Sequence, residues 1–401
     1  AAVGALLGAL TWGGRRWAGA APALAPLAAG LLALDPTASL YSRFGFSYNA
    51  LAPLISVFVL GLWGYAETRA RRWLALAAAL IGLGLLIDLW AGALLGPLIG
   101  LALWRRPRDL AWSLPLAAAP FTLYLGGLWL SAPAAALFDL RFTLLRLNAI
   151  PLAQQVATLT DNAGQVALAN PAFALGGLGL LGLRPAGLRA AAALTFFLPL
   201  ALLGRTVALY SLSAYYLIPL YPLAALGLAT LSLRLWEAAG QRAPLRAGLS
   251  VAALFTAVML LALNLVPWRD GFTTPIDDFL VAAADARAAA GFVNAHAAPD
   301  DLVLASPAVA WQLTGRAADF QMAAAAAGQA TPHLPADLPA ARWVFDPRFE
   351  RARYLVVDNL WRNWAVVHVP AVDAWWRAMD NWPIVFQTGA ITIYAHPTTN
   401  P

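Results

Sequence analysis

Long apolar runs, separated by short polar or arginine-containing segments, fill the first two thirds of the chain. A helix that spans a bilayer needs about 20 mostly apolar residues. The runs comprise residues 1–12, 17–34, 48–66, 73–87, 91–104, 110–131, 171–183, 188–204, 214–235 and 249–266. Several are short, which indicates re-entrant pieces, tilted boundaries or a locally thin bilayer. The pattern predicts a polytopic α-helical membrane protein with about ten apolar spans, of which the run from Ala1 to Trp12 forms a partial one.

Arginines between the runs alternate in density, and this alternation predicts the topology. Arginine-rich loops mark the cytoplasmic side. With the sides alternating along the chain, the inside loops collect Arg15, Arg16, Arg69, Arg71, Arg72, Arg105, Arg106, Arg108, Arg184, Arg189, Arg234, Arg242 and Arg246. The outside loops receive only Arg43, Arg141, Arg146 and Arg205. This alternation of sides places all residues after Val266 on the outer side of the membrane.

After residue 268 the pattern changes to that of a soluble α/β domain. Helical spacing covers residues 278–296 and 372–381, a turn into an apolar strand is expected at residues 300–306, and a second buried strand is expected at residues 353–358. Residues 384–387 and 390–394 flank Thr388-Gly389 and predict a closing hairpin. We therefore expect two domains, a membrane domain over residues 1–268 and an extracytoplasmic α/β domain over residues 269–401.

The amino-acid composition is that of a membrane protein, and it excludes some kinds of functional site. Of the 401 residues, 61% are hydrophobic and 11% charged, against about 25% charged in soluble domains. The net charge of +6 comes from arginine, since there is no lysine, and arginine between apolar runs favours lipid contact over nucleic acid. Cysteine is absent, which excludes disulfides and thiolate sites. The arginine-rich, alanine-rich composition indicates a GC-rich bacterial genome, and the expected location is the bacterial plasma membrane.

Candidate chemistry gathers on the predicted outer side. The polar set there comprises Asp35, Arg43, Asn49, Asp88, Asp139, Arg141, Arg146 and Arg205. Arginines bind phosphate and carboxylates act as general bases, so this set suits a lipid-linked sugar phosphate whose tail lies in the bilayer. A divalent metal ion is a candidate cofactor for such a site. No nucleotide-binding or HExxH motif is present, so the sequence gives no support for nucleotide-driven pumping.

Several of these features also have structural interpretations. Asp88 can line a substrate cavity or cap the following helix. Asp139, Arg141 and Arg146 fall on a stretch with amphipathic spacing, which predicts an interfacial helix rather than a plain connector. Gly92, Gly96 and Gly100 recur every four residues and favour packing within the molecule over a dimer face.

The tryptophans and histidines of the C-terminal domain can likewise have structural or functional roles. Its tryptophans include Trp361, Trp364, Trp375, Trp376 and Trp382, which favour core packing over a sugar-binding platform. Its four histidines are widely spaced, which favours surface positions over a metal site.

Two stretches resemble a known family. Leu40-Tyr41-Ser42-Arg43-Phe44-Gly45-Phe46-Ser47-Tyr48-Asn49 follows a Gly-Arg-Arg turn and an apolar helix. Ser213-Ala214-Tyr215-Tyr216-Leu217-Ile218-Pro219-Leu220-Tyr221-Pro222 opens a late apolar run. Together with the topology they resemble the GT-C membrane glycosyltransferases, in particular the dolichyl-phosphate-mannose–protein mannosyltransferase and aminoarabinose-transferase-like group. A C-terminal extracytoplasmic α/β domain fits many bacterial members of that group.

The resemblance implies an inverting transfer of a sugar from a polyprenyl-phosphate donor to an extracytoplasmic lipid, glycan or protein acceptor. It implies that Arg43 and Arg205 bind the donor phosphate, that Asn49 orients donor or metal, and that Asp35 and Asp88 shape the catalytic cavity. The chain departs from the family at Asn49, where many members carry aspartate, and before Tyr215, where an arginine is usual.

The resemblance also implies a catalytic residue that the sequence does not contain. The main catalytic acid of the family lies in its first external loop, after the first spanning helix. The chain starts at Ala1 within an apolar run of about half a span. We therefore expect the sequence to be a fragment in which the first helix, the catalytic loop and the main base would precede Ala1.

Two other functions remain open. The chain could be a transporter or flippase for a lipid-linked solute, which predicts polar residues near mid-depth. It could also be a non-catalytic, membrane-anchored module that binds a glycan or a protein.

Overall fold

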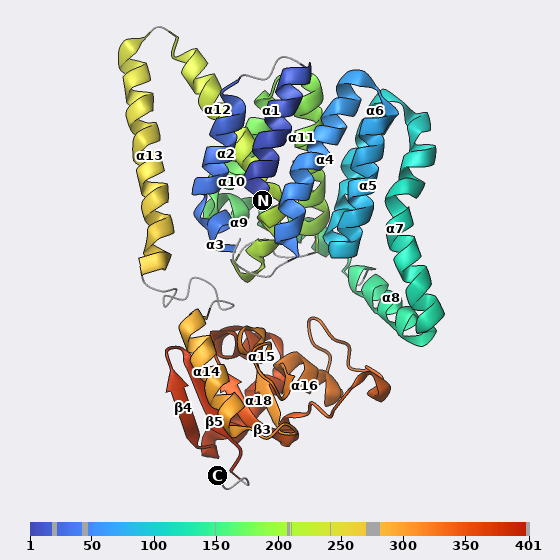
Figure 1. Cartoon of the computed structure of the whole chain (residues 1–401), viewed down its shortest axis with the longest axis vertical. Helices are drawn as coiled ribbons and strands as arrows, with labels where there is room; N and C mark the ends of the chain where they lie inside the picture. The colour runs from blue at the N-terminus through green and yellow to red at the C-terminus, as the bar shows by residue number, and fades with distance from the viewer. Residues whose placement is uncertain are drawn as a thin grey trace. The chain divides into compact units, whose positions relative to one another are not determined.

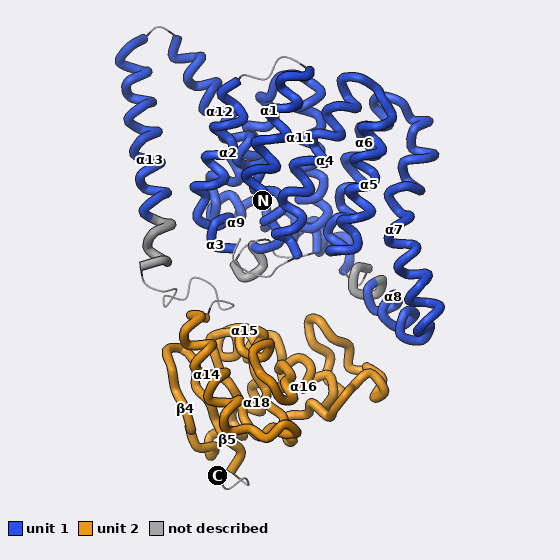
Figure 2. Tube along the Cα trace, viewed as in Figure 1, with its two compact units in different colours: residues 1–264 blue, residues 265–401 orange. Residues whose placement is uncertain are grey.

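The computed structural model describes residues 1–17, 22–41, 47–148, 150–206, 209, 211–240, 242–269 and 281–397. The chain forms two compact units, residues 1–264 and 265–401, and the boundary falls a few residues before the predicted 268/269 (Figure 2). Unit 1 is helical, and unit 2 combines helices with a small sheet.

The first part of unit 1, up to residue 131, is built from helical segments in its described residues (Figure 1). They are α1 (Ala2–Trp17), α2 (Leu24–Leu34), α3 (Pro36–Tyr41), α4 (Tyr48–Thr68), α5 (Arg71–Ile87), η1 (Leu89–Leu94) with α6 (Leu95–Arg105), and η2 (Pro107–Asp109) with α7 (Leu110–Ser131). The second part comprises α8 (Pro133–Asn148), α9 (Leu152–Ala169), α10 (Pro171–Gly179) with η3 (Leu180–Gly182), α11 (Ala186–Gly204), η4 (Ser211–Leu220), α12 (Tyr221–Ala238) and α13 (Ala243–Arg269).

The apolar run predicted from Ala1 to Trp12 forms a longer helix than expected. Helix α1 begins at Ala2, one residue after Ala1, and continues through Gly13-Gly14-Arg15-Arg16 to Trp17. The Ala5 backbone N–H donates to the Ala1 carbonyl at 2.9 Å, which closes the first helical turn. The predicted arginine turn after the run is therefore wrong, because Arg15 and Arg16 belong to the last turn of α1, where basic side chains are favourable.

Helix α4 lies at the centre of unit 1 because its apolar side chains surround the helix. Leu51, Ile55, Phe58 and Leu62 are fully buried, and α4 packs against α1, α5 and α11. A helix that is apolar on all sides is a buried helix. Helix α13 is equally apolar, yet none of its membrane-spanning window is buried inside the protein. Its side chains are therefore available to lipid.

Among the described residues, five helices are long and apolar enough to cross a membrane: α4, η2–α7, α11, the end of η4 with α12, and α13. The bent pair α9 and α10–η3, which turns by 109°, would make a sixth. The predicted count of about ten is higher because four runs form shorter helices. Helices α1, α2, α5 and α6 have 16, 11, 17 and 11 residues. The run at 171–183 forms only the second arm of the bent pair.

The predicted outer loop at residues 132–170 is mostly helical. Helix α8 contains the stretch predicted as an amphipathic helix, and α9 follows it. Helix α10 begins at Pro171, and Asn170 caps it by accepting a hydrogen bond from the Phe173 backbone N–H at 3.0 Å. Proline at the first helical position and asparagine before it form a standard helix start, so the chain turns sharply here.

Two backbones approach closely where α10 crosses α12. A Cβ atom at Gly227 would overlap the Gly176 carbonyl oxygen, and one at Gly176 would overlap Ala224. Only glycine permits such an approach. The crossing fixes α10 against α12 and thereby positions the residues before each helix.

Unit 2 contains a five-stranded sheet in the order β2-β1-β3-β5-β4. Its strands are β1 (Leu302–Ala305), β2 (Arg316–Ala318), β3 (Ala352–Val357), β4 (Ile384–Thr388) and β5 (Ile391–Ala395). Strands β2, β1 and β3 are parallel, whereas β3, β5 and β4 are antiparallel. The predicted strands and hairpin are confirmed, and the three-residue β2 was not predicted.

Helices cover both faces of this sheet. On one face α14 (Ala283–His296) and α15 (Pro307–Ala310) pack on Val303, Val356 and Ile393. On the other, α16 (Phe320–Ala326) and α18 (Pro370–Ala378) pack on Leu304 and Leu355. The remaining helical segments are η5 (Ala340–Arg342), η6 (Phe349–Arg351), the π-helix η7 (Leu360–Ala365), α17 (Val366–His368) and η8 (Met379–Asn381).

Candidate functional site

Asp35 lies at the junction of α2 and α3. Its Oδ1 accepts a hydrogen bond from the Ala38 backbone N–H at 2.7 Å, so the carboxylate caps α3. The Tyr221 hydroxyl lies within electrostatic range of this carboxylate and hydrogen-bonds Thr37 and Asn170. The Asn170 amide donates to that hydroxyl at 2.9 Å. The start of α3, the start of α10 and the start of α12 therefore meet in one polar cluster, which we call the Asp35 cluster.

Asp88 forms a second polar cluster at the end of α5. One oxygen accepts from the Trp90 backbone N–H at 2.8 Å and caps η1, and the other accepts from the Ser47 hydroxyl at 2.7 Å. The capping interpretation of Asp88 is thus confirmed. The indole of Trp90 donates to the Tyr216 carbonyl at 3.1 Å, and the Tyr48 ring packs on Tyr216 with centroids 5.2 Å apart. This Asp88 cluster joins α4, α5 and η4.

The Asp35 and Asp88 clusters are connected through η4. Tyr215 and Tyr216 lie in η4, which leads directly into Tyr221, the first residue of α12. The Asn49 amide donates to the Tyr41 carbonyl at 2.9 Å and joins the end of α3 to the start of α4. The sequence-predicted Asp35, Asn49 and Asp88 lie before α3, in the first turn of α4 and after α5, and Figure 1 shows α3 and these ends of α4 and α5 at the same end of unit 1.

Arg205 follows α11 and is held by α9. Its guanidinium donates to the Gln155 side-chain oxygen at 3.0 Å and to the Leu202 carbonyl at 3.1 Å. Both partners are neutral, so they leave the positive charge of the half-buried Arg205 uncompensated. Nearby, the buried Asn162 donates to the Gly204 carbonyl at 2.6 Å and accepts from the Leu209 N–H at 2.7 Å. These amides fix α9 against the link between α11 and η4.

An apolar pocket of about 330 Å³ lies between α9, α10 and α11. Its lining residues are Leu159, Asn162, Ala163, Val166, Ala167, Phe173, Ala174, Leu178, Phe196, Phe197, Leu200 and Leu209. Asn162 is the polar side chain among them, and both ends of its amide are bound to backbone. The pocket therefore offers hydrocarbon contacts, and its size falls in the range of small-ligand sites.

This pocket reaches the Asp35 cluster through one aromatic contact. Phe173 lines the pocket and packs on the Tyr221 ring, with centroids 5.2 Å apart. Arg205 adjoins the pocket on another side, because Gly204 binds the lining residue Asn162. The pocket therefore has contacts with both polar groups, through Phe173 to the Asp35 cluster and through Asn162 to the residue before Arg205.

The other predicted site residues are not brought to this location. Arg43 lies outside the described residues, and so does the side chain of Arg146. Asp139 and Arg141 are exposed on α8. The stretch is helical, as predicted, while its position at a membrane surface stays a prediction.

Sequence reasoning missed the amides of the bent pair. Gln155, Asn162 and Asn170 are separated by seven and eight residues, which is about two helical turns in each case. That spacing places them on one side of a helix and could have singled them out. The sequence prediction placed a helix only around Asp139 to Arg146 in this loop, so the helical spacing of the amides had no place in it.

Asp109 was also missed, and it is fully buried at the opposite, arginine-rich end of unit 1. Its carboxylate accepts from the Tyr65 hydroxyl at 2.9 Å, the Trp112 indole at 3.2 Å and the Arg71 guanidinium at 3.2 Å. A buried carboxylate needs such compensation. These contacts tie α4, α5 and η2–α7 together, and Asp109 is a structural residue.

In unit 2, Ser306 and Asp358 follow the adjacent parallel strands β1 and β3. The chain leaves β1 toward β2 on one side and leaves β3 toward β5 on the other, so this is the topological switch point where α/β sheets often bind ligands. Here the Ser306 hydroxyl donates a short hydrogen bond to Asp358, and both residues are 1% exposed. Burial raises the pKa of Asp358, and the Ser306 and Trp361 hydrogen bonds partly oppose that shift.

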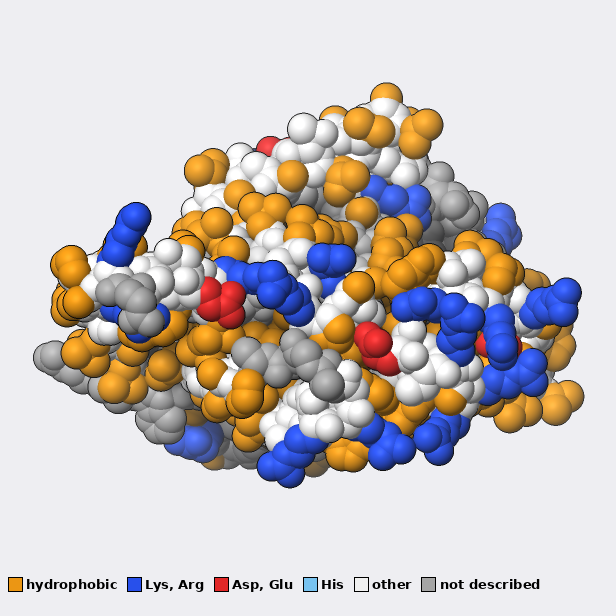
Figure 3. All heavy atoms as spheres, turned by 90° about the horizontal axis from the view of Figure 1, so that it is seen from above, with side chains coloured by type: hydrophobic (Ala, Val, Ile, Leu, Met, Phe, Trp, Pro, Cys, Tyr) orange, Lys and Arg blue, Asp and Glu red, His pale blue; other side chains and the backbone are white. Residues whose placement is uncertain are grey.

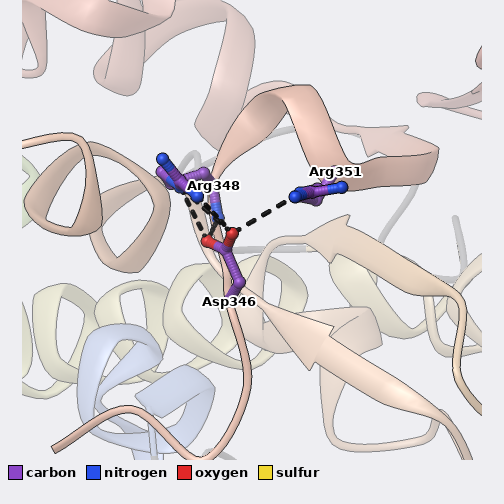
Figure 4. A network of polar contacts seen from close by, with 3 residues as sticks. All are labelled: Asp346, Arg348 and Arg351. Atoms are coloured by element: carbon purple, nitrogen blue, oxygen red, sulfur yellow. Dashed lines mark hydrogen bonds and ion pairs between the residues drawn. The ribbon is translucent and has the colours of Figure 1, made fainter. Parts of the chain in front are cut away.

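A surface ion cluster lies just before β3 (Figure 4). Arg348 donates to both oxygens of Asp346 at 2.6–3.1 Å, and the Arg351 guanidinium lies 3.6 Å from the same carboxylate. The Arg348 hydrogen bonds lower the pKa of Asp346 to about 2. This cluster organises a loop rather than a reaction centre.

The core-packing interpretation of the tryptophans is confirmed for three of the five. Trp361, Trp375 and Trp382 are 0–8% exposed. Trp364 and Trp376 are half-buried, and the Trp364 ring lies between His333 and His368, with centroids 6.2 and 4.9 Å away.

Within the described parts of the chain, no three histidine, aspartate or glutamate side chains are grouped as metal ligands. Comparisons with protein families, with curated proteins and with solved structures found no match to this chain.

Proposed function

We propose that the chain transfers a sugar from a polyprenyl-phosphate donor to an acceptor at the outer face of the membrane, as the GT-C-like stretches indicate. The observation that carries this proposal is the apolar pocket between α9, α10 and α11, which has Arg205 on one side and the Asp35 cluster on another. A polyprenyl-phosphate sugar has a hydrocarbon tail, an anionic phosphate and a polar ring, in that order. The pocket, the Arg205 guanidinium and the Asp35 cluster offer one suitable environment for each of these three parts.

In this proposal the polyprenyl tail enters the pocket and its phosphate binds Arg205. The guanidinium keeps its charge available because its described partners, Gln155 and the Leu202 carbonyl, are neutral. Hydrogen bonds between arginine and phosphate are charge-assisted and are among the strong ones in proteins. Arg43 is the second candidate phosphate ligand, and Asn49 is a candidate for orienting the donor.

The reaction forms a bond between an acceptor oxygen and the anomeric carbon while the bond from that carbon to the phosphate oxygen breaks. The acceptor proton passes to a carboxylate, and the polyprenyl phosphate leaves with the bonding electrons. Within this chain we assign the base role to Asp35, because Tyr221 and Phe173 connect it to the pocket. Asp88 holds Ser47 and Trp90 and is assigned to shaping the cavity.

The proposal includes the topology expected from the arginines. All of the apolar runs then contribute to about ten crossings, and the short helices cross where the bilayer is locally thin. The α3 end of unit 1 and the whole of unit 2 then face the outside of a bacterial plasma membrane, where lipid-linked donors and envelope acceptors meet.

The test is a transfer assay in liposomes with a radiolabelled polyprenyl-phosphate sugar and acceptor extract. We expect Arg205→Gln to lower transfer at least tenfold, since it removes a charge-assisted contact worth about 1.5–3 kcal/mol. Asp35→Asn removes the base and should lower transfer about a hundredfold or more. Arg141→Gln is the matched control, since it removes an exposed outer arginine on α8. Undiminished transfer by both site variants would reject this site. Movement of intact donor across the bilayer without transfer would favour the transporter.

A second candidate function concerns unit 2. Trp364 is half-buried beside two exposed histidines, which makes it the accessible aromatic face among the tryptophans of the π-helix. Sugar rings stack on such faces, so unit 2 could bind a glycan acceptor. Retention of the chain on immobilised envelope glycans should fall for Trp364→Ala. Equal retention of the variant would leave Trp364 as a packing residue.

A further inference from the structure

A second pocket lies at the opposite end of unit 1, between α1 and α2. It has a volume of about 240 Å³ and is lined by Leu10, Thr11, Gly14 and Arg15 of α1 and by Leu24 and Ala25 of α2. Leu10 and Leu24 are 6% and 4% exposed, so the inner wall is a packed apolar surface. One guanidinium and one hydroxyl provide the polar part of the lining.

Arg15 differs from several arginines at this end in having no partner among the described residues. The guanidinium of Arg16 lies 5.4 Å from the Trp12 ring centre, that of Arg72 lies 5.6 Å from Trp73, and that of Arg105 lies 3.9 Å from Trp104. Arg71 is bound to Asp109. Arg15 is exposed and lines the pocket instead. Its charge is therefore available to an anion that enters there.

The surroundings of this pocket indicate the depth at which it lies in a bilayer. Trp12, which is 42% exposed, lies on α1 between the lining residues Thr11 and Gly14, and its ring packs on Trp17 and Trp73 with centroids 5.2–5.3 Å apart. Tryptophans gather at the headgroup level of membranes. Figure 3 shows that arginine side chains are abundant on this face and acidic ones are few. A pocket in this layer meets lipid phosphates at its mouth and acyl chains along its apolar wall.

We propose that this pocket binds an anionic phospholipid, with the phosphate on Arg15 and Thr11 and an acyl chain along Leu10, Leu24 and Ala25. Arginine and a hydroxyl are suitable phosphate ligands, and one arginine near an anionic surface contributes about 1 kcal/mol. The buried leucines distinguish this ligand from a free phosphate ion, which would gain nothing from them. The site lies at the end of the bundle opposite to α3, so the proposal goes beyond sugar transfer.

The test is native mass spectrometry of the full chain with phosphatidylglycerol or with phosphatidylcholine of the same acyl chains. Arg15→Gln should weaken phosphatidylglycerol retention about fivefold, the loss that corresponds to about 1 kcal/mol. Arg16→Gln removes the same charge one residue along, from an arginine whose partner is Trp12, and should leave retention unchanged. Thr11→Val, which removes only the hydroxyl, should weaken it by a smaller factor.

Three results would overturn the proposal. Equal retention by Arg15→Gln and Arg16→Gln would show that only the total charge matters. Equal retention of phosphatidylcholine by the wild-type chain would remove the requirement for an anion. Displacement of phosphatidylglycerol by excess inorganic phosphate would show that the site takes a free anion.

Discussion

At the scale of single residues, two carboxylates of unit 2 show opposite electrostatics. Asp358 is buried beneath the switch point of the sheet, and its burial raises its pKa. Asp346 is 37% exposed and held by Arg348, which lowers its pKa to about 2. A carboxyl group whose pKa is raised by folding stabilises the folded state at low pH, and this stabilisation is lost as the pH rises through the folded-state pKa. A carboxyl group whose pKa is lowered by folding stabilises the folded state above the unfolded-state pKa of about 3.9.

We therefore predict that Asp358→Asn slows local opening of the sheet at neutral pH, because the asparagine cannot ionise. The advantage should shrink as pH falls toward the unfolded pKa, where the native Asp358 is also protonated. The measurement is hydrogen–deuterium exchange of peptides covering β3, with variant and wild type compared at the same pH. Asp346→Asn is the control of opposite sign and should speed exchange at neutral pH. If the difference in exchange rate between Asp358→Asn and the wild type did not change with pH, the raised pKa of Asp358 would be contradicted.

At the scale of elements, the crossing of α10 and α12 is the feature on which the site depends. It sets the positions of Asn170 and Tyr221, each next to the start of one of these helices. The Gly227 position tolerates no side chain because the Gly176 carbonyl occupies the space. Relief would require the two helices to separate, and the polar cluster would separate with them.

Gly227→Ala should therefore destabilise the protein by about 1–3 kcal/mol, the usual cost of overpacking. Gly126→Ala is the matched control, since a Cβ there meets nothing within 4 Å on α7. Thermal unfolding in detergent, followed by the helical circular dichroism signal, measures both. A control variant at least as destabilised as Gly227→Ala would assign the effect to helix backbone changes in general.

Sequence patterns predicted helices and strands well where residues close together in the sequence determine the local structure. The spacing of Gly96 and Gly100 indicated packing within the molecule, and these glycines face Leu198 and Leu194 of α11. The strands of unit 2 followed from short apolar runs. Strand β2 has three residues and no apolar run, so its place depends on pairing with β1 rather than on its own sequence.

The parts of the site that could not be predicted depend on long-range contacts. Asn162 binds residues 42 and 47 positions later in the chain, and Asn170 binds Tyr221 across 51 positions. No local period reveals such partners. The pocket itself arises where α9 and α10 bend by 109° against α11, and that bend depends on the packing of three helices.

At the scale of the whole molecule, the topology can be tested with single cysteines, since the chain has none of its own. Arg141→Cys in α8 and Val344→Cys in unit 2, where Val344 is 98% exposed, should react with a membrane-impermeant maleimide on intact cells. Arg108→Cys in η2 should react only after permeabilisation. Labelling of Arg108→Cys and Arg141→Cys from the same side would contradict the alternation of the arginines.

The most direct test of the central claim is photo-crosslinking with a polyprenyl-phosphate sugar that carries a diazirine in its tail. The account predicts labelled peptides from α9, α10 and α11, competed by unmodified donor and reduced by Ala163→Phe, which fills the pocket. Ala111→Phe, an exposed position on α7, should leave the labelling unchanged. Labelling confined to other helices, or unaffected by Ala163→Phe and by competing donor, would show that the pocket does not hold the donor lipid.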